Sequence, residues 1–155
     1  MTTPRAVVIG IGNQLRRDDG IGPAVAAHIQ RREIPGIRVV ITHGEPMGLL
    51  DAWAGVRLAV VIDAVATEPC TPGRWRRIAA DHLAPPCGAV GTHGFGICEA
   101  LELGRVLNHV PQQLIIYAVD VGDVTVGQGL SAPVAATVPV LVDAVLGELD
   151  RMDTG

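Results

Sequence analysis

The chain has 155 residues, which is long enough for one domain with a buried core and too short for two such domains. Its formal net charge of -4 argues against binding nucleic acid through a basic face. Only 3% of the residues are aromatic, so the core must be built mainly from Val, Ile, Leu and Ala. We expect a single domain over residues 1–155.

Nothing in the sequence predicts export or a membrane anchor. The N-terminal residues lead directly into a strand-like run without a signal-peptide pattern, and no apolar run reaches the length of a membrane-spanning helix. The three cysteines, Cys70, Cys87 and Cys98, form no C-x-x-C pair, as expected in a reducing compartment. We therefore expect a cytoplasmic protein.

The first part of the chain alternates between strand and helix patterns. Continuous apolar runs predict buried strands over residues 5–11 and 58–64, and a further strand is predicted over 37–42. Helical spacing of apolar residues predicts a helix over 20–32, and a short helix is predicted over 47–53. In the first of these helices, Asp18 or Asp19 can cap the start.

The second part continues this alternation with one exception. Residues 74–78 alternate polar and apolar side chains, which predicts an edge or antiparallel strand, and 81–93 read as a long irregular loop. A helix is expected over 94–107, a strand over 114–121, and a last helix from the N-cap Ser131 to about Asp150. The order predicts an α/β fold with a largely parallel sheet and helices on both faces.

Polar side chains follow the predicted strands, at the edge where sites lie in such sheets. They are Asp19 after the first strand, His43 and Glu45 after the second, Asp63 at the end of the third, Asp120 at the end of the last, and His93 before a helix.

Several common sites are disfavoured. A dinucleotide-binding loop would need glycine at Leu15, and no acidic residue follows the second strand. The chain has no lysine, and its only serine, Ser131, lies on a predicted helix cap and not on a nucleophile elbow. A cysteine nucleophile near His93 is conceivable, but Cys98 falls inside a helix and reads as a small buried residue.

Asp19, Asp63 and His93 remain as a candidate site. Two carboxylates and an imidazole suit a divalent metal such as zinc or nickel, and three protein ligands leave positions open. Each residue also has a structural interpretation: Asp19 could cap a helix, Asp63 could bond loop amides, and His93 could be a structural loop residue. Their convergence on one sheet edge favours a site.

Four segments resemble, in the same order, the motifs of the hydrogenase maturation endopeptidases, which remove the C-terminal extension from the large subunit of nickel–iron hydrogenases. They are residues 10–22 (G-x-G-N-x-L-x-x-D-D-G-x-G), 60–64 (VVIDA), 92–96 (THGFG) and 129–134 (GLSAPV). The first motif is specific alone and the others are specific in combination. Together they span nearly the whole chain.

The resemblance implies both a fold and a mechanism. The fold is a three-layer α/β/α domain with a mostly parallel five-stranded sheet and one antiparallel strand, for which residues 74–78 are the candidate. Asp19, Asp63 and His93 match the metal-contacting positions, which leaves Asp18 as the helix cap. The nickel would belong to the substrate, a hydrogenase large-subunit precursor, and the enzyme would cleave only after nickel insertion. The family leads us to expect a monomer.

One position departs from the family pattern. Many relatives carry an aspartate after the second strand, where this chain has His43, followed by Gly44 and Glu45. Glu45 could replace the carboxylate, the carboxylate could be dispensable, or substrate recognition could differ. This departure motivates one alternative to the leading function, a non-catalytic maturation partner. A second alternative is a related protease acting on another precursor.

Overall fold

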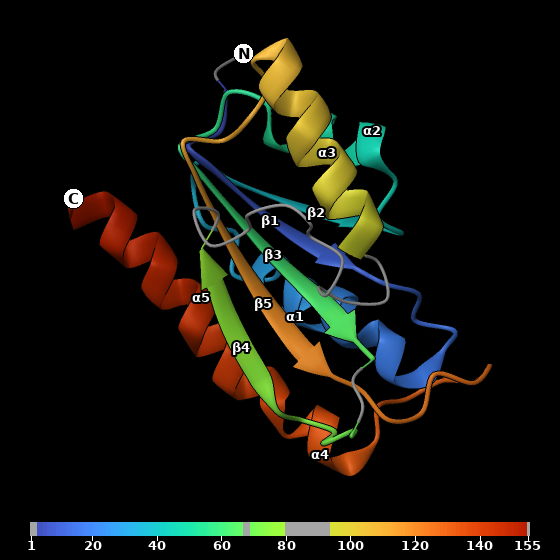
Figure 1. The fold of residues 1–155 in the computed structure, drawn as a ribbon. Coiled ribbons are helices and arrows are strands. Elements are labelled where there is room, and N and C mark those ends of the chain that lie inside the picture. Colours follow the sequence, from blue (N-terminus) through green and yellow to red (C-terminus); the bar gives the residue numbers. More distant parts are fainter. Residues whose placement is uncertain (1–2, 67–68, 80–93, 155) are drawn as a thin grey trace.

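The structure is a computed structural model that describes residues 3–66, 69–79 and 94–154. Within this part of the chain, five strands form one sheet in the order β2-β1-β3-β5-β4 (Figure 1). Their bounds are Ala6–Ile11 (β1), Ile37–Thr42 (β2), Leu58–Val65 (β3), Trp75–Ala79 (β4) and Gln113–Asp120 (β5). Only β4 runs antiparallel to its neighbour among these strands, and it lies at the edge beside β5.

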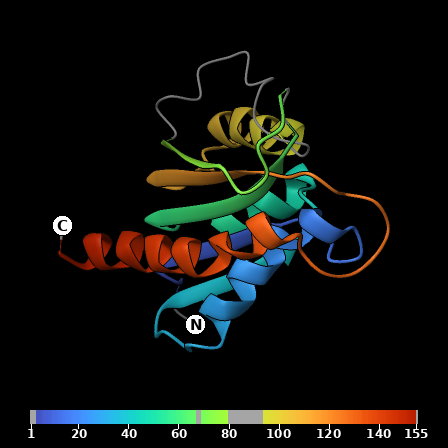
Figure 2. The ribbon, with the colours of Figure 1, turned by 90° about the horizontal axis from the view of Figure 1, so that it is seen from below.

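The helices form a layer on each face of the sheet. Figure 2 shows α1 and α5 on one side and α2 and α3 on the other. Their bounds are Arg17–Gly20 (the 3-10 helix η1), Ile21–Gln30 (α1), Pro46–Trp53 (α2), Gly94–Leu107 (α3), Ala132–Ala135 (α4) and Thr137–Thr154 (α5). The chain is therefore the expected three-layer α/β/α domain.

Side-chain alternation divides the core into two clusters. In β1, Ala6 and Val8 pack with α1 and α5, while Val7, Ile9 and Ile11 pack with α2 and α3. Strand β3 follows the same rule and is buried along its whole length. A strand covered by helices on both faces must be apolar at every position, which is why these runs could be recognised in the sequence.

The predicted elements match the observed ones to within a few residues, with informative differences at their ends. Strand β3 continues to Val65, so Asp63 lies inside the strand and does not end it. Strand β5 ends at Asp120, one residue earlier than predicted. The predicted loop over 81–93 lies outside the described residues.

The predicted last helix is interrupted at Ala136, between α4 and α5. Pro139 cannot donate a main-chain hydrogen bond to the carbonyl four residues earlier, and its ring crowds that carbonyl, so a continuous helix is disfavoured here. The Thr137 hydroxyl donates instead to the Val134 carbonyl at 2.6 Å, which satisfies one acceptor at the break.

The same segment corrects the expectation that no apolar run is long enough to span a membrane. By length and composition, Ala132–Thr154 would suffice to cross a membrane, with a mean hydropathy of 1.6 in its most apolar window. In the structure Leu141, Val145 and Leu149 of this segment lie in the core against the sheet. Packing in the domain thus accounts for the apolar composition of the helix.

A buried carboxylate ties α5 to the edge of the sheet. Glu148 accepts hydrogen bonds from the Tyr117 hydroxyl at 2.8 Å and from Arg77 Nε at 2.6 Å, and Arg151 lies 2.8 Å away. Burial opposes ionisation of Glu148, but the bonds from Arg77 and Tyr117 outweigh it and lower the pKa of the carboxyl group. Burial and the bond to Glu148 raise the pKa of Tyr117 to about 12.

Replacing Glu148 with Gln should lower the free energy of unfolding by about 1–3 kcal/mol at pH 7, because the bonds from Arg77 and Tyr117 lose their charged acceptor. The folded-state pKa lies below the ordinary 4.5, so the ionised group stabilises the fold above that pH. The deficit should shrink as the pH falls through the folded-state pKa. Urea titrations of wild type, Glu148→Gln and the exposed control Glu102→Gln test this; an equal deficit at pH 3 and pH 7 would contradict it.

Candidate active site

Asp19 reaches the sheet edge through a tight loop after β1. Gly12 has a φ of 150°, and a side chain there would collide with the Asp19 carbonyl oxygen. The next residue, Asn13, donates its main-chain N–H to Asp19 Oδ2 at 2.9 Å. Asp19 is only 4% exposed. The glycine loop therefore fixes both the main chain and the carboxylate of Asp19.

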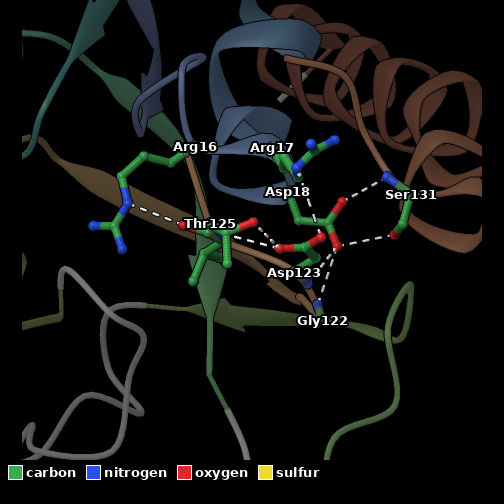
Figure 3. Close-up of polar contacts among 8 residues, drawn as sticks. Arg16, Arg17, Asp18, Gly122, Asp123, Thr125 and Ser131 are labelled. Atoms are coloured by element: carbon green, nitrogen blue, oxygen red, sulfur yellow. Dashed lines mark hydrogen bonds and ion pairs between the residues drawn. The ribbon is translucent and has the colours of Figure 1, made fainter. Parts of the chain in front are cut away.

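Asp18 has a different role from the predicted helix cap. Its fully buried carboxylate accepts hydrogen bonds from four donors on the segment after β5 (Figure 3). These donors are the main-chain N–H groups of Gly122 at 3.1 Å, Asp123 at 3.2 Å and Ser131 at 2.7 Å, and the Ser131 hydroxyl at 2.9 Å. Helix α1 instead has Gly20 at its N-cap, without a side-chain cap. We call this set of four bonds the Asp18 clamp.

Ser131 lies where it was predicted, at the start of a helix, but its side chain does not cap that helix. Its hydroxyl donates to Asp18, at a separation of 113 residues. Main-chain bonds extend the clamp: Gly127 N–H donates to the Leu15 carbonyl at 2.8 Å, and Arg17 N–H donates to the Gly127 carbonyl at 3.1 Å. The loop after β1 and the loop after β5 thus form one rigid unit.

Asp63 occupies the same edge of the sheet from β3 and is fully buried. Its strand neighbours Ala59 and Val61 face α2 and α3, so alternation places Asp63 on that face as well. Asp63 is aligned with Ala118 of β5, and Asp120 is aligned with Val65. A second carboxylate, that of Asp120, is therefore on the neighbouring strand and on the same face, two residues farther along.

His93 lies outside the described residues, but the helix that follows it is placed. Helix α3 begins at Gly94, the next residue. A side chain at Gly96, in its first turn, would collide with the Gly44 carbonyl oxygen. The first turn of α3 is therefore packed against the loop between β2 and α2, at the edge that carries Asp19 and Asp63.

The described residues hold only part of the predicted ligand set. Among residues 3–66, 69–79 and 94–154, no three His, Cys, Asp or Glu side chains are grouped so that they could hold a metal ion. Asp19 and Asp63 are two buried carboxylates at this edge, and the predicted third ligand, His93, lies outside the described residues. The role of His93 as a metal ligand therefore stays a prediction.

The loop after β2 carries His43 and Glu45, which the sequence analysis singled out. His43 and Glu45 are both exposed. The Thr42 hydroxyl donates to Glu45 Oε2 at 3.0 Å. Main-chain and Thr42 hydrogen bonds, together with the nearby His43, lower the pKa of the Glu45 carboxyl group. In this arrangement the Glu45 carboxylate is hydrogen-bonded within its own loop.

A separate cavity of about 430 Å³ lies along α1, beside the loop after β1. Its lining includes Arg17, His28 and Arg31, and contains no acidic residue among the described residues. Asp19 and Asp63 do not line it. The cavity is therefore distinct from the carboxylate site.

The comparisons with known proteins agree with this fold. The family model described as hydrogenase maturation protease matches residues 23–148. The chain belongs to this family. Among solved structures, the hydrogenase maturating endopeptidase HybD from Escherichia coli has the same fold, with a TM-score of 0.84 at 20% identity over 96% of this chain and 93% of that one. HybD from Thermococcus kodakarensis has a TM-score of 0.76 at 21% identity, covering 92% and 97%.

Two curated relatives of the chain also match. The hydrogenase 2 maturation protease of Escherichia coli (strain K12) is 26% identical over 149 residues, or 94% of this chain and 90% of that protein. The hydrogenase expression/formation protein HupD of Thiocapsa roseopersicina is 31% identical over 120 residues, which are 75% of this chain and 54% of that protein. The matched stretch thus spans about half of HupD. The predicted family and fold are confirmed.

Asp18→Asn should destabilise the protein by about 2–4 kcal/mol, because an amide cannot satisfy four donors that now share a carboxylate. Ser131→Ala should cost only about 1 kcal/mol, since it removes one hydroxyl bond and leaves the main-chain bond in place. Urea unfolding of both variants measures the difference. Equal costs, or no cost for Asp18→Asn, would show that the clamp does not hold the two loops.

Proposed function

We propose that this protein is an endopeptidase that removes the C-terminal extension of a nickel–iron hydrogenase large-subunit precursor after nickel has been inserted. The observation that carries the proposal is the pair of buried carboxylates, Asp19 and Asp63, at the carboxyl edge of the sheet in a member of a protease family. Relatives named as a hydrogenase 2 maturation protease and as HupD support the substrate class.

In this proposal, nickel is part of the substrate. Asp19, Asp63 and His93 bind the ion already present in the precursor, and a precursor without nickel is not held in place for cleavage. Two oxygen donors and one nitrogen donor are a suitable set for nickel. The buried Asp19 and Asp63 fit the oxygen part of that set, and α3 begins directly after His93 at the same edge.

Cleavage proceeds by direct attack of water on the scissile carbonyl carbon. The sole serine is engaged with Asp18, and Cys98 is buried in α3, so neither is placed as a nucleophile. A catalytic metal has two common roles, to polarise a carbonyl group and to lower the pKa of a bound water. The substrate nickel supplies one of these two, while Asp19 and Asp63 orient it.

The precursor is then the protein partner, and the enzyme acts on it as a cytoplasmic monomer. Neither nucleic acid nor a membrane takes part in this reaction. The net charge of -4 favours a protein partner over nucleic acid, because nucleic-acid binding through a basic face usually goes with a positive net charge.

Nickel-loaded precursor should be cut by the wild-type protein and nickel-free precursor should not. Asp63→Asn should reduce cleavage of the loaded precursor at least about 100-fold, because an amide replaces a nickel-binding carboxylate, and loss of one electrostatic contributor in an active site costs roughly 10²–10³ in rate. Asp51→Asn, at an exposed position on α2, is the matched control and should cleave normally. The mass of the precursor before and after incubation reports cleavage.

Equal processing of both precursor forms would overturn nickel probing, and full activity of Asp63→Asn would overturn the assignment of the site. A wild-type protein that binds the loaded precursor without cutting it would instead identify a non-catalytic maturation partner. The departure at His43, which is exposed beside the site edge, is the feature that makes this second outcome worth measuring.

A further inference from the structure

Asp120 is a buried carboxylate that the proposed site does not use. Asp120 is 5% exposed, and its Oδ1 is buried without a hydrogen-bond partner among the residues that the structure describes. Buried polar atoms in folded proteins are almost always hydrogen-bonded, and burying an ionised carboxylate without partners is costly. A buried carboxylate oxygen without a partner therefore points to a role other than stabilising the fold.

The sheet places Asp120 at the candidate site. Alternation along β5 puts Asp120 on the same face as Leu114 and Ile116, which pack with α2 and α3, and Asp63 is on that face of β3. The register aligns Asp120 with Val65, two residues beyond Asp63. Standard strand spacing then separates the Cα atoms of Asp63 and Asp120 by about 8 Å.

The main chain holds Asp120 in this position. Its N–H donates to the Arg74 carbonyl at 2.7 Å, and its own carbonyl accepts from Gly73 N–H at 2.9 Å. Its neighbour Val121 donates to the Val65 carbonyl at 3.1 Å. Asp120 is thus fixed between β3 and the segment that begins β4, so its carboxylate is presented by a rigid part of the fold.

We propose that Asp120 is the general base of the cleavage reaction, an inference that rests on the proposed function. Asp19 and Asp63 bind the substrate nickel in that function, and their lone pairs are engaged there. The water oxygen bonds to the scissile carbonyl carbon while one water proton moves to the Asp120 carboxylate. The carbon–nitrogen bond then breaks, and the proton passes from Asp120 to the leaving amine, which regenerates the carboxylate.

Single-turnover and steady-state cleavage of nickel-loaded precursor by Asp120→Asn tests the assignment. We expect kcat to fall at least about 100-fold, in the range for loss of a general base, with KM within about twofold of wild type. Asp143→Asn, at an exposed position on α5, is the control and should retain wild-type kcat. Thermal melts should show no loss of stability in Asp120→Asn, because the change removes a buried charge that has no hydrogen bond at Oδ1.

Chemical rescue separates catalysis from a structural role. Asp120→Ala should regain cleavage when formate is added, because a small carboxylate can occupy the space and accept the proton, whereas Asp63→Ala should not regain nickel-dependent cleavage. A kcat for Asp120→Asn within threefold of wild type would overturn the inference. So would a lost activity that comes with a lower melting temperature and no rescue. Both outcomes leave the proposed function standing when wild type cleaves, while an inactive wild type is a failure of the proposed function itself.

Discussion

The carboxylate of Asp18 joins two loops that are more than 100 residues apart in the sequence, and the geometry of the candidate site depends on that junction. Four donors from the segment after β5 converge on it. Burying a carboxylate is costly unless its oxygens accept hydrogen bonds, and here the four donors come from another part of the chain. The loop after β1 therefore cannot move without the loop after β5.

Asp19 is the next residue, so the bonds that hold Asp18 restrain it as well. The Asp18 clamp holds it from one side, and the close approach of Gly12 and the N–H of Asn13 hold it from the other. The two neighbouring aspartates thus have different roles: Asp18 fixes the loops, and Asp19 is presented at the edge of the sheet. A binding or catalytic group held on rigid elements loses little freedom when substrate arrives.

Much of the fold could be predicted from the sequence because its signals are local. Continuous apolar runs identified β1 and β3, and the polar–apolar alternation around Arg76 identified β4 as the antiparallel edge strand. Convergence of Asp19 and Asp63 followed from the rule that parallel strands end at one edge. The side of the sheet that each residue faces also follows from a period of two along a strand.

The role of Asp18 could not be predicted in the same way. An aspartate just before a helix is a good local reason to predict a cap, and its true donors are 104 to 113 residues away. The only signal available was indirect: the sole serine of the chain, Ser131, stands in a motif of its own. Asp120 was visible as a residue at the edge, but its burial and its missing hydrogen bond are properties of the packed sheet.

The most direct test is to locate the nickel ion in a complex with a cleavage-resistant, nickel-loaded precursor, using anomalous diffraction at the nickel edge. We expect a single peak about 2 Å from carboxylate oxygens of both Asp19 and Asp63, the usual length for such metal–oxygen bonds, with Asp18 still bound to Ser131. A nickel peak away from both carboxylates, or one bound by Asp18, would contradict the division of roles between the two aspartates.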